Sequence, residues 1–257
     1  MNKNLFIQAC CGGLAAVAFS GCVSERFKPS SVTPQPVTID GPPAPKLDEP
    51  GTLAQAAAQP PAPVGGADWQ PLFDGESLHG WRVTPFDGGG KVEVRQGLIA
   101  LGTGDPFTGV NYTNDAPKVN YEIALEAMRV GGSDFFCGLT FPVRDAFCSL
   151  IIGGWGGSVV GLSSVDGMDA SENETTQFID FATGRWYRVR LRVTGQKIEA
   201  WIEQKKVVNL TSTGRKISQR FGDIEMSKPL GIASWSTSAA VREIKLRRVT
   251  TPDSPTE

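Results

Sequence analysis

Residues 67–249 predict an all-β protein, an antiparallel sandwich of two sheets with at most one short helix. Three observations lead to this fold class. All six tryptophans of the chain, and most of its β-branched residues, lie in this range. The apolar residues occur in short runs separated by glycine, aspartate and asparagine, a pattern typical of antiparallel sandwiches. No segment has the long 3.6-residue period of an extended amphipathic helix.

The strands follow from these runs in chain order. Alternation and β-branched content predict strands at 80–84, 92–95, 98–101, 108–112, 120–130, 134–142, 147–153, 157–162, 176–181, 186–194, 197–203, 205–209, 230–235 and 240–248. A single segment, 215–221, is expected to form the short helix.

One hairpin can be predicted residue by residue. Two alternating segments flank a turn at 194–197, and pairing Val193 with Ile198 makes both faces complementary. The same register pairs Leu191 with Ala200 and Val189 with Ile202 inside, and Arg192 with Glu199, Arg190 with Trp201 and Arg188 with Glu203 outside. The three arginines could form an anion site, but this register favours ion pairs and stacking on the indole.

Composition excludes several classes of function. The chain has 25 lysines and arginines against 27 aspartates and glutamates, so no net field attracts nucleic acid or an anionic membrane. A membrane is expected to be reached only through a lipid anchor. A single histidine, His79, excludes mechanisms that need a histidine pair and histidine-rich zinc sites. Any catalysis is therefore expected to use carboxylates. Cys137 and Cys148 are expected either as a disulfide across a hairpin or as buried free thiols.

Residues 1–22 have the form of a lipoprotein signal peptide. A positive charge precedes an apolar run that is too short to span a membrane as a helix, and Ser20 and Gly21 then stand before Cys22. Cys22 is the expected lipid attachment site, and Val23 resembles an outer-membrane sorting signal. The chain is therefore expected to be exported and lipid-anchored to the cell envelope, at the outer membrane. Ordinary cleavage after a small residue is the alternative.

Two segments are expected to be disordered. Residues 23–66 contain ten of the eighteen prolines and only one aromatic residue, Phe27, so they are expected to form an extended tether. Residues 250–257 are expected to form a short tail.

The opening of the domain resembles the 3-keto-disaccharide hydrolase domain family. The resemblance is carried by Trp69-Gln70-Pro71-Leu72-Phe73-Asp74-Gly75-Glu76-Ser77-Leu78-His79-Gly80-Trp81, and by Gly97-Leu98-Ile99, Gly184-Arg185-Trp186-Tyr187, Leu230-Gly231-Ile232 and Val241-Arg242-Glu243-Ile244. It implies a concanavalin-type or laminin-G-like jelly roll whose concave face takes carbohydrate. It also implies a hydrolase, lyase or hydratase that acts on 3-keto-glycosides.

The opening motif itself is expected to be structural. Asp74 should bond its own backbone, Gly75 should take a positive φ, and Trp81 should pack inside. His79 is expected to cap a turn. The sequence departs from the family at Ser133–Phe141 and in the later strand Cys148–Trp155, where the resemblance implies an Asn-Ser-Gly strand followed by a strand with Glu and Gln toward the groove. A non-catalytic glycan-binding module and a surface scaffold therefore stand as alternatives to the enzyme.

The densest group of acids lies in the loop 165–176. The family chemistry needs a base for the C2 proton and a cation or donors for the enolate, so Asp169 or Glu172 is the expected base. Asp166 and Asp169 could hold a divalent cation such as Ca²⁺, with Glu174 as a further oxygen ligand. A solvated loop that satisfies its own turns is the alternative.

Three residues are expected to bind the carbohydrate. Trp155 lies among glycines, where an exposed indole can stack on a sugar ring, although a place in the core fits equally well. Asp134 at a strand start and Glu174 in the acidic loop are expected to bond sugar hydroxyls.

Overall fold

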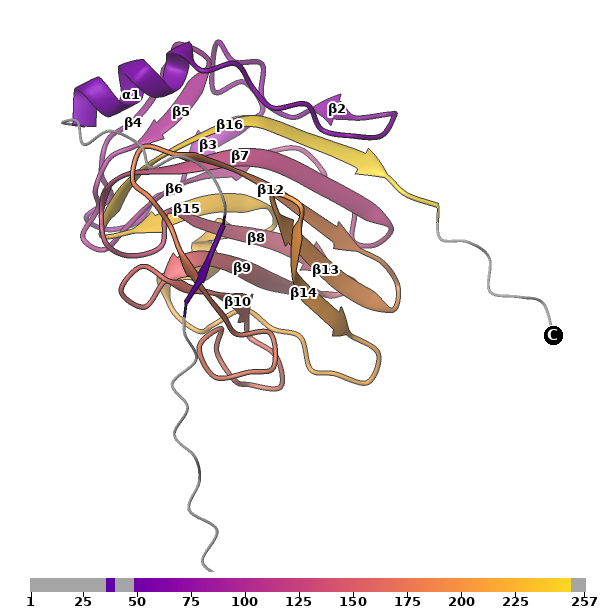
Figure 1. The fold of residues 1–257 in the computed structure, drawn as a ribbon. Helices are drawn as coiled ribbons and strands as arrows, with labels where there is room; N and C mark the ends of the chain where they lie inside the picture. Colours follow the sequence, from indigo (N-terminus) through magenta and orange to yellow (C-terminus); the bar gives the residue numbers. More distant parts are fainter. Residues whose placement is uncertain (1–35, 40–48, 251–257) are drawn as a thin grey trace, which may run out of the picture. The chain divides into compact units, whose positions relative to one another are not determined.

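The computed structural model describes residues 36–39 and 49–250, and these residues form a two-layer β-sandwich (Figure 1). Besides the strands, the described residues contain the α-helix α1 at Glu49–Ala58 and the 3-10 helix η1 at Asp223–Ser227. The strands are β1 Val37–Thr38, β2 Gln70–Pro71, β3 Trp81–Val83, β4 Val92–Arg95, β5 Leu98–Leu101, β6 Phe107–Tyr112, β7 Tyr121–Gly132, β8 Cys137–Val143, β9 Ala146–Gly154, β10 Val159–Ser163, β11 Gln177–Asp180, β12 Trp186–Val193, β13 Lys197–Ile202, β14 Lys205–Thr211, β15 Gly231–Trp235 and β16 Thr237–Arg248.

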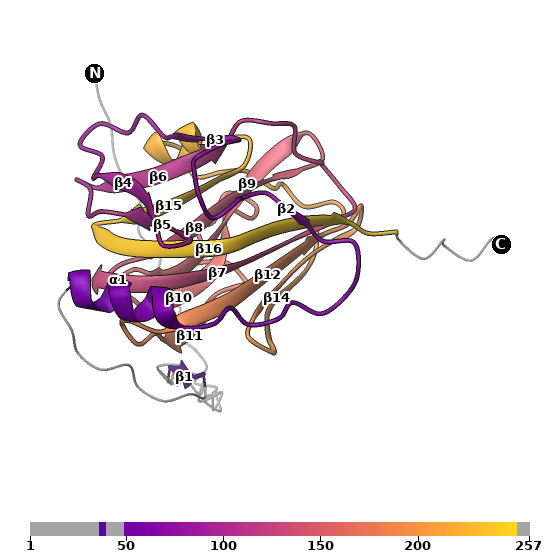
Figure 2. The same cartoon turned by 90° about the horizontal axis from the view of Figure 1, so that it is seen from above.

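The strands form two sheets that stack face to face (Figure 2). The first sheet has the order β1-β11-β10-β9-β8-β15-β6-β3, and the second has the order β14-β13-β12-β7-β16-β5-β4 with β2 added to β16. All pairs are antiparallel except β1 with β11. The all-β sandwich predicted from the sequence is therefore confirmed, and each predicted strand segment overlaps an observed strand.

The core lies between the two sheets because successive side chains along a strand point to opposite faces. Leu139 and Leu150 of the first sheet, and Leu191 and Val241 of the second, belong to one buried cluster. The alternate residues of the first sheet, such as Ser149 and Ile151, point to its outer face. That outer face carries the site described below.

The predicted hairpin register is confirmed at every position that pairs β12 with β13. Val193 lies opposite Ile198, and Arg190 lies opposite Trp201 with its guanidinium 3.9 Å from the ring centroid. Arg188 forms an ion pair of 2.8 Å with Glu203. Complementary side chains on both faces were therefore sufficient to set this register.

The predictions for the helical parts were wrong. The segment 215–221 is not a helix: Ile217 bridges to Val165, and the short 3-10 turn comes later, at Asp223–Ser227. Pairing with a distant loop replaced the local helical hydrogen bonds that the sequence pattern suggested.

Part of the expected tether is ordered, which corrects the prediction for residues 23–66. Helix α1 lies on the outer face of the second sheet, where Ala56 is fully buried and its carbonyl accepts a 3.1 Å hydrogen bond from the Trp186 indole. The Arg242 guanidinium donates to the carbonyl of Gln59 at 2.7 Å. These contacts to residues far along the chain offset the cost of ordering a proline-rich segment. The signal peptide, Cys22 and residues 251–257 of the expected tail lie outside the described residues.

The opening motif has the predicted structural role. Asp74 accepts hydrogen bonds from the N–H groups of Ser77 and Glu76, both at 2.8 Å, and these bonds lower the pKa of Asp74. Gly75 has a φ of 80°. Trp81 is buried, and its indole donates to the Leu72 carbonyl at 2.7 Å.

Cys137 and Cys148 are buried free thiols, which decides between the two expectations. Burial raises the pKa of each thiol to about 12. Among the residues that the structure describes, no helix has the length and apolar character needed to cross a membrane.

Candidate carbohydrate site

A pocket of about 490 Å³ lies on the outer face of the first sheet. We call it the aromatic pocket. It is lined by Pro106, Phe107, Asp134, Phe135, Ser149, Ile151, Trp155, Ser163, Arg220, Phe221, Gly222, Asp223, Ile224 and Trp235. Its wall is therefore mostly apolar, with a few polar groups, as is usual for small-molecule sites.

The floor of the pocket is built from aromatic rings that pack on the sheet. Phe107 meets Trp235 edge-on, with ring centroids 4.6 Å apart and an interplanar angle of 85°. Phe135 covers Gly138, where an added Cβ would lie 3.0 Å from the Phe135 ring. The glycine therefore lets the ring lie against the strand. Trp235 keeps 37% of its surface exposed, so part of the indole faces the pocket.

Trp155 stands on the rim in a tight turn. Its φ is 50°, and the side chain is 42% exposed. The carboxylate of Asp134 accepts a 2.7 Å hydrogen bond from the Phe135 N–H and a 3.3 Å hydrogen bond from the Gly156 N–H. Asp134 therefore ties the turn of Trp155 to the segment that leads into β8.

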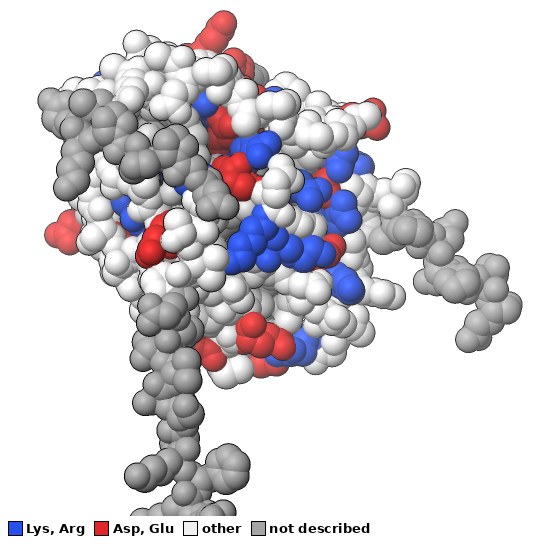
Figure 3. Space-filling view, viewed as in Figure 1, with Lys and Arg blue, Asp and Glu red and all other residues white. Residues whose placement is uncertain are grey.

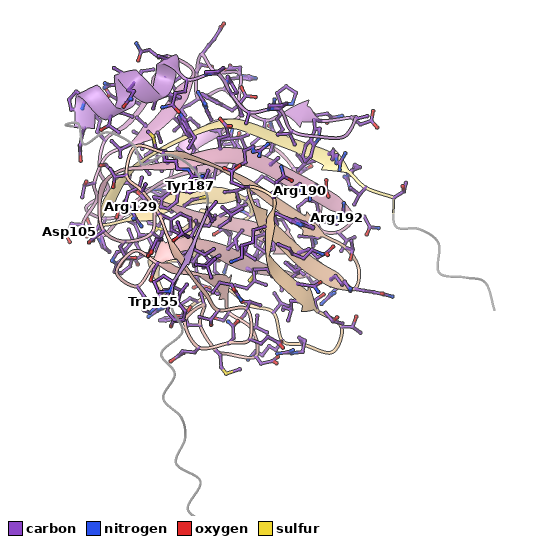
Figure 4. The ribbon with its side chains drawn as sticks, viewed as in Figure 1. Asp105, Arg129, Trp155, Tyr187, Arg190 and Arg192 are labelled. Atoms are coloured by element: carbon purple, nitrogen blue, oxygen red, sulfur yellow. The ribbon has the colours of Figure 1, made fainter. Side chains whose placement is uncertain are left out.

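Arg129 fixes the same two loops from below. Its side chain is 6% exposed, and the guanidinium donates to the carbonyls of Asp134 at 3.2 Å, Gly153 at 3.3 Å and Gly157 at 2.9 Å. Burial lowers the pKa of Arg129. Figure 4 shows Arg129 and Trp155 on the same side of the ribbon. A buried cation held by carbonyls thus makes the Trp155 rim rigid.

Two charged residues enter from the segment that follows β14. Arg220 lies 5.9 Å from the Trp155 ring centroid and pairs with Asp169. Asp223 lines the pocket at the start of η1, and no described residue forms a hydrogen bond or ion pair with its carboxylate. Gln219 holds this segment on the sheet by donating to the Thr140 hydroxyl at 3.0 Å. The pocket therefore has one cation and one free carboxylate near its aromatic wall.

The structure brings together only some of the predicted site residues. Trp155 and Asp134 line the pocket. Asp169 does not line it, but bonds two residues that do, Ser163 and Arg220. Its carboxylate is thus engaged as an ion-pair partner.

The other predicted acids lie away from the pocket. Asp166 and Glu174 both pair with Arg215, and the N–H of Lys216 together with Arg215 lowers the pKa of Asp166. Glu172 is exposed and accepts a long 3.4 Å hydrogen bond from the Asp169 N–H. The acidic loop therefore matches the alternative in which it satisfies its own turns and nearby arginines.

The expected divalent cation does not fit these side chains. The carboxylate oxygens of Asp166 and Asp169 already accept hydrogen bonds, each from an arginine and from a backbone N–H, and in Asp169 also from a hydroxyl group. Across residues 36–39 and 49–250, no group of three or more His, Cys, Asp or Glu side chains could hold a metal ion. A hard cation needs several free oxygen ligands, and these two carboxylates do not supply them.

Sequence reasoning missed Arg220, Asp223 and Trp235. Trp235 carried a usable signal, because its position at the end of a predicted strand places it on the same face as Ala233. Arg220 and Asp223 carried none, since a helix was expected over 215–221 and no element was expected at Asp223.

The described residues thus form a β-sandwich domain with an aromatic pocket on the outer face of one sheet. The chain belongs to the 3-keto-alpha-glucoside-1,2-lyase-like domain family, whose sequence model matches residues 68–247. The resemblance seen in the opening motif is thereby confirmed. No curated protein matches the chain.

Several solved structures are similar to this chain. The carbohydrate binding module CBM66 from Bacillus subtilis is 11% identical, with a TM-score of 0.45 over 65% of this chain and 95% of that one. The VIP36 exoplasmic/lumenal domain, in its Ca²⁺ and Man3GlcNAc-bound form, is 10% identical, with a TM-score of 0.48 over 72% and 90%. Apo Crh5 transglycosylase is 11% identical, with a TM-score of 0.46 over 72% and 85%. Identities this low say nothing about what this chain binds.

Proposed function

We propose that the domain binds a glycosyl unit in the aromatic pocket. The proposal is carried by one observation, the two half-exposed indoles of Trp155 and Trp235 on a pocket of about 490 Å³. The C–H face of a sugar ring packs on such indoles, while its hydroxyls need donors and acceptors at the edge. Arg220 would donate to hydroxyls, and Asp223 would accept from them.

Titration calorimetry with a panel of glycans tests this proposal. Trp155→Ala is expected to weaken binding by up to about tenfold, because an aromatic contact contributes roughly 0.5–1.5 kcal/mol. The matched control is Trp201→Ala, which removes an indole from the second sheet. Equal losses in both variants, or no binding by the unaltered chain, would count against the pocket.

We propose further that the bound sugar is a 3-keto-glycoside and that the domain eliminates its C1 substituent. Membership of the family supports this substrate class. Asp223 would take the C2 proton, which the 3-keto group acidifies, and the electron pair would form an enolate on O3 beside Arg220. The C3 carbonyl then re-forms, the C1–C2 double bond forms, and the bond from C1 to the leaving oxygen breaks, while Asp223 returns its proton to that oxygen so that it leaves as an alcohol. Addition of water to that double bond would complete hydrolysis.

Turnover of 3-keto-glucosides tests the second proposal. Asp223→Asn is expected to abolish turnover and keep binding, whereas Glu172→Gln, which changes an acid outside the pocket, is expected to leave both unchanged. Binding without turnover in the unaltered chain would identify a non-catalytic glycan-binding module. If the unaltered chain shows neither glycan binding nor turnover, the result would favour a surface scaffold.

We also propose that the chain is lipid-anchored to the cell envelope through Cys22. The support is the sequence of residues 1–22 alone. Metabolic labelling with palmitate should be lost in Cys22→Ala, and unchanged labelling would remove the proposal.

A further inference from the structure

A second pocket lies at the edge of the other sheet. It has a volume of about 410 Å³ and is lined by Ala67, Asp68, Arg192, Thr194, Arg247, Arg248, Val249 and Thr250. We call it the arginine pocket. Figure 3 shows lysine and arginine side chains gathered on the face that carries β12 to β14, and Figure 4 places Arg190 and Arg192 there.

A single buried carboxylate organises the arginines. Glu122 of β7 is fully buried, and its Oε1 accepts from Nε of Arg192 at 2.5 Å and from Nη1 of Arg190 at 3.4 Å. Its Oε2 accepts from Nε of Arg247 at 2.7 Å. Three guanidinium groups therefore converge on one negative charge.

The cluster keeps an excess of positive charge. Two further acids lie nearby. Asp68 lines the arginine pocket, and Glu199 lies 3.9 Å from Arg192 but pairs more closely, at 2.5 Å, with Lys206. Against Glu122 and Asp68 stand four arginines, Arg190, Arg192, Arg247 and Arg248. Burial lowers the pKa of Arg190, and the charges of Arg192 and Arg247 lower it further, whereas Glu122 opposes them. Mutual repulsion of this kind is relieved when an anion binds.

The strand β16 and the segment 59–69 before β2, which we call the strap, hold the outer part of the arginine pocket in place. The Ala67 carbonyl accepts from Nη1 of Arg247 at 3.3 Å, and the Trp69 ring lies 4.6 Å from the same guanidinium. Arg248 is exposed, and no described residue pairs with its side chain. Arg248 therefore has all its donors available beside two arginines that are already fixed.

We propose that the arginine pocket binds a phosphate group carried by a small ester or by a lipid headgroup. A doubly charged oxyanion has enough oxygens to accept from Arg192, Arg247 and Arg248 together, and guanidinium groups bind it through paired N–H donors. The hairpin arginines do not make this site alone, because Arg188 pairs with Glu203 and Arg190 stacks on Trp201, as the sequence predicts, and only Arg192 lines the pocket. The site arises where β16 adds Arg247 and Arg248.

Calorimetric titration of the full chain with pyrophosphate tests the proposal. Arg248→Gln is the main variant, since the guanidinium it removes supports no described contact. This substitution is expected to weaken pyrophosphate binding about tenfold, because it removes one charge-assisted hydrogen bond. Arg82→Gln, an exposed arginine of β3 on the first sheet, is the matched control and should bind as the unaltered chain does. No binding, or equal losses in both variants, would overturn the site.

Vesicles separate the two sources of phosphate. The Cys22→Ala chain, which cannot be acylated at that cysteine, is sedimented with vesicles that contain phosphatidic acid, whose headgroup is a phosphate monoester, and with vesicles of phosphatidylcholine alone. Arg248-dependent binding to the first alone, displaced by pyrophosphate, assigns a lipid headgroup. Pyrophosphate binding without vesicle binding assigns a soluble phosphate ester.

Discussion

At the scale of single residues, the second sheet is held together by buried charges that have partners. Glu126 and Arg242 pair at 2.6 Å with side chains only 3% and 6% exposed, and Glu122 is fully buried among three arginines. Burying such groups is unfavourable unless each keeps its partner. The loss of one member should therefore cost more than the loss of any exposed ion pair.

Glu122→Ala is predicted to lower the free energy of unfolding by about 3–5 kcal/mol, because it leaves Arg190, Arg192 and Arg247 without their shared acceptor. Urea denaturation followed by circular dichroism measures this change. Glu93→Ala, which removes a partly exposed acid paired with Lys91 and Arg95 at the surface, is the control and should leave the midpoint almost unchanged. A Glu122→Ala midpoint equal to that of the control would contradict this role.

The buried thiols predict an alkaline loss of stability. Burial raises the pKa of Cys137 and of Cys148 from the ordinary 9.0 to about 12 in the folded state, so the unfolded state releases these protons first. Stability from this source is complete below pH 9.0 and falls as the pH rises toward about 12. Urea midpoints across this range should show the fall.

The same thiols should be unreactive until the domain unfolds. The control is the variant with Cys137→Ala and Cys148→Ala, which should match the native chain in reaction with a thiol reagent at pH 8. After unfolding in urea, this variant should show two fewer reactive thiol groups than the unaltered chain. Reaction of Cys137 or Cys148 in the native state would contradict their burial.

At the scale of elements, the sequence predicted the strands and the hairpin register, because both follow from the alternation of apolar and polar residues. The β12–β13 register followed from side-chain complementarity alone, because both halves lie close in the chain. Helix α1 could not be predicted, since its partner Trp186 lies 130 residues away and its surroundings are rich in proline. Its stability comes from packing on the second sheet rather than from helix propensity.

Ala56→Glu is predicted to release α1 from the sheet, because it places a charge at a fully buried position. Hydrogen exchange over 49–58 should speed up while the sandwich strands keep their protection. Ala54→Glu makes the same change at an exposed position of the helix and should have no such effect. Equal protection in both variants would show that α1 does not depend on this contact.

Residues of the aromatic pocket were predictable only where their neighbours in the sequence mark them. Trp155 was found because glycines surround it in the sequence, and Asp134 because it begins a strand. Arg220 and Asp223 reach the pocket because Gln219 ties their segment to Thr140, a residue 79 positions earlier. That long-range hydrogen bond leaves no local pattern, so the acidic loop was chosen for its density of acids instead.

At the scale of the whole domain, the two sheets carry different surfaces. The outer face of the first sheet holds the aromatic pocket, and the second sheet holds the helix, the strap and the arginine pocket. Neither pocket shares a lining residue with the other. Substitutions in one are therefore expected to leave ligand binding at the other unchanged.

The most direct measurement is a crystal structure of the chain with a 3-keto-glucoside. The account predicts a sugar ring in the aromatic pocket, with one face against Trp155 or Trp235 and a hydroxyl or keto oxygen within hydrogen-bond distance of Arg220. A sugar bound elsewhere on the domain, with this pocket filled only by water, would contradict it.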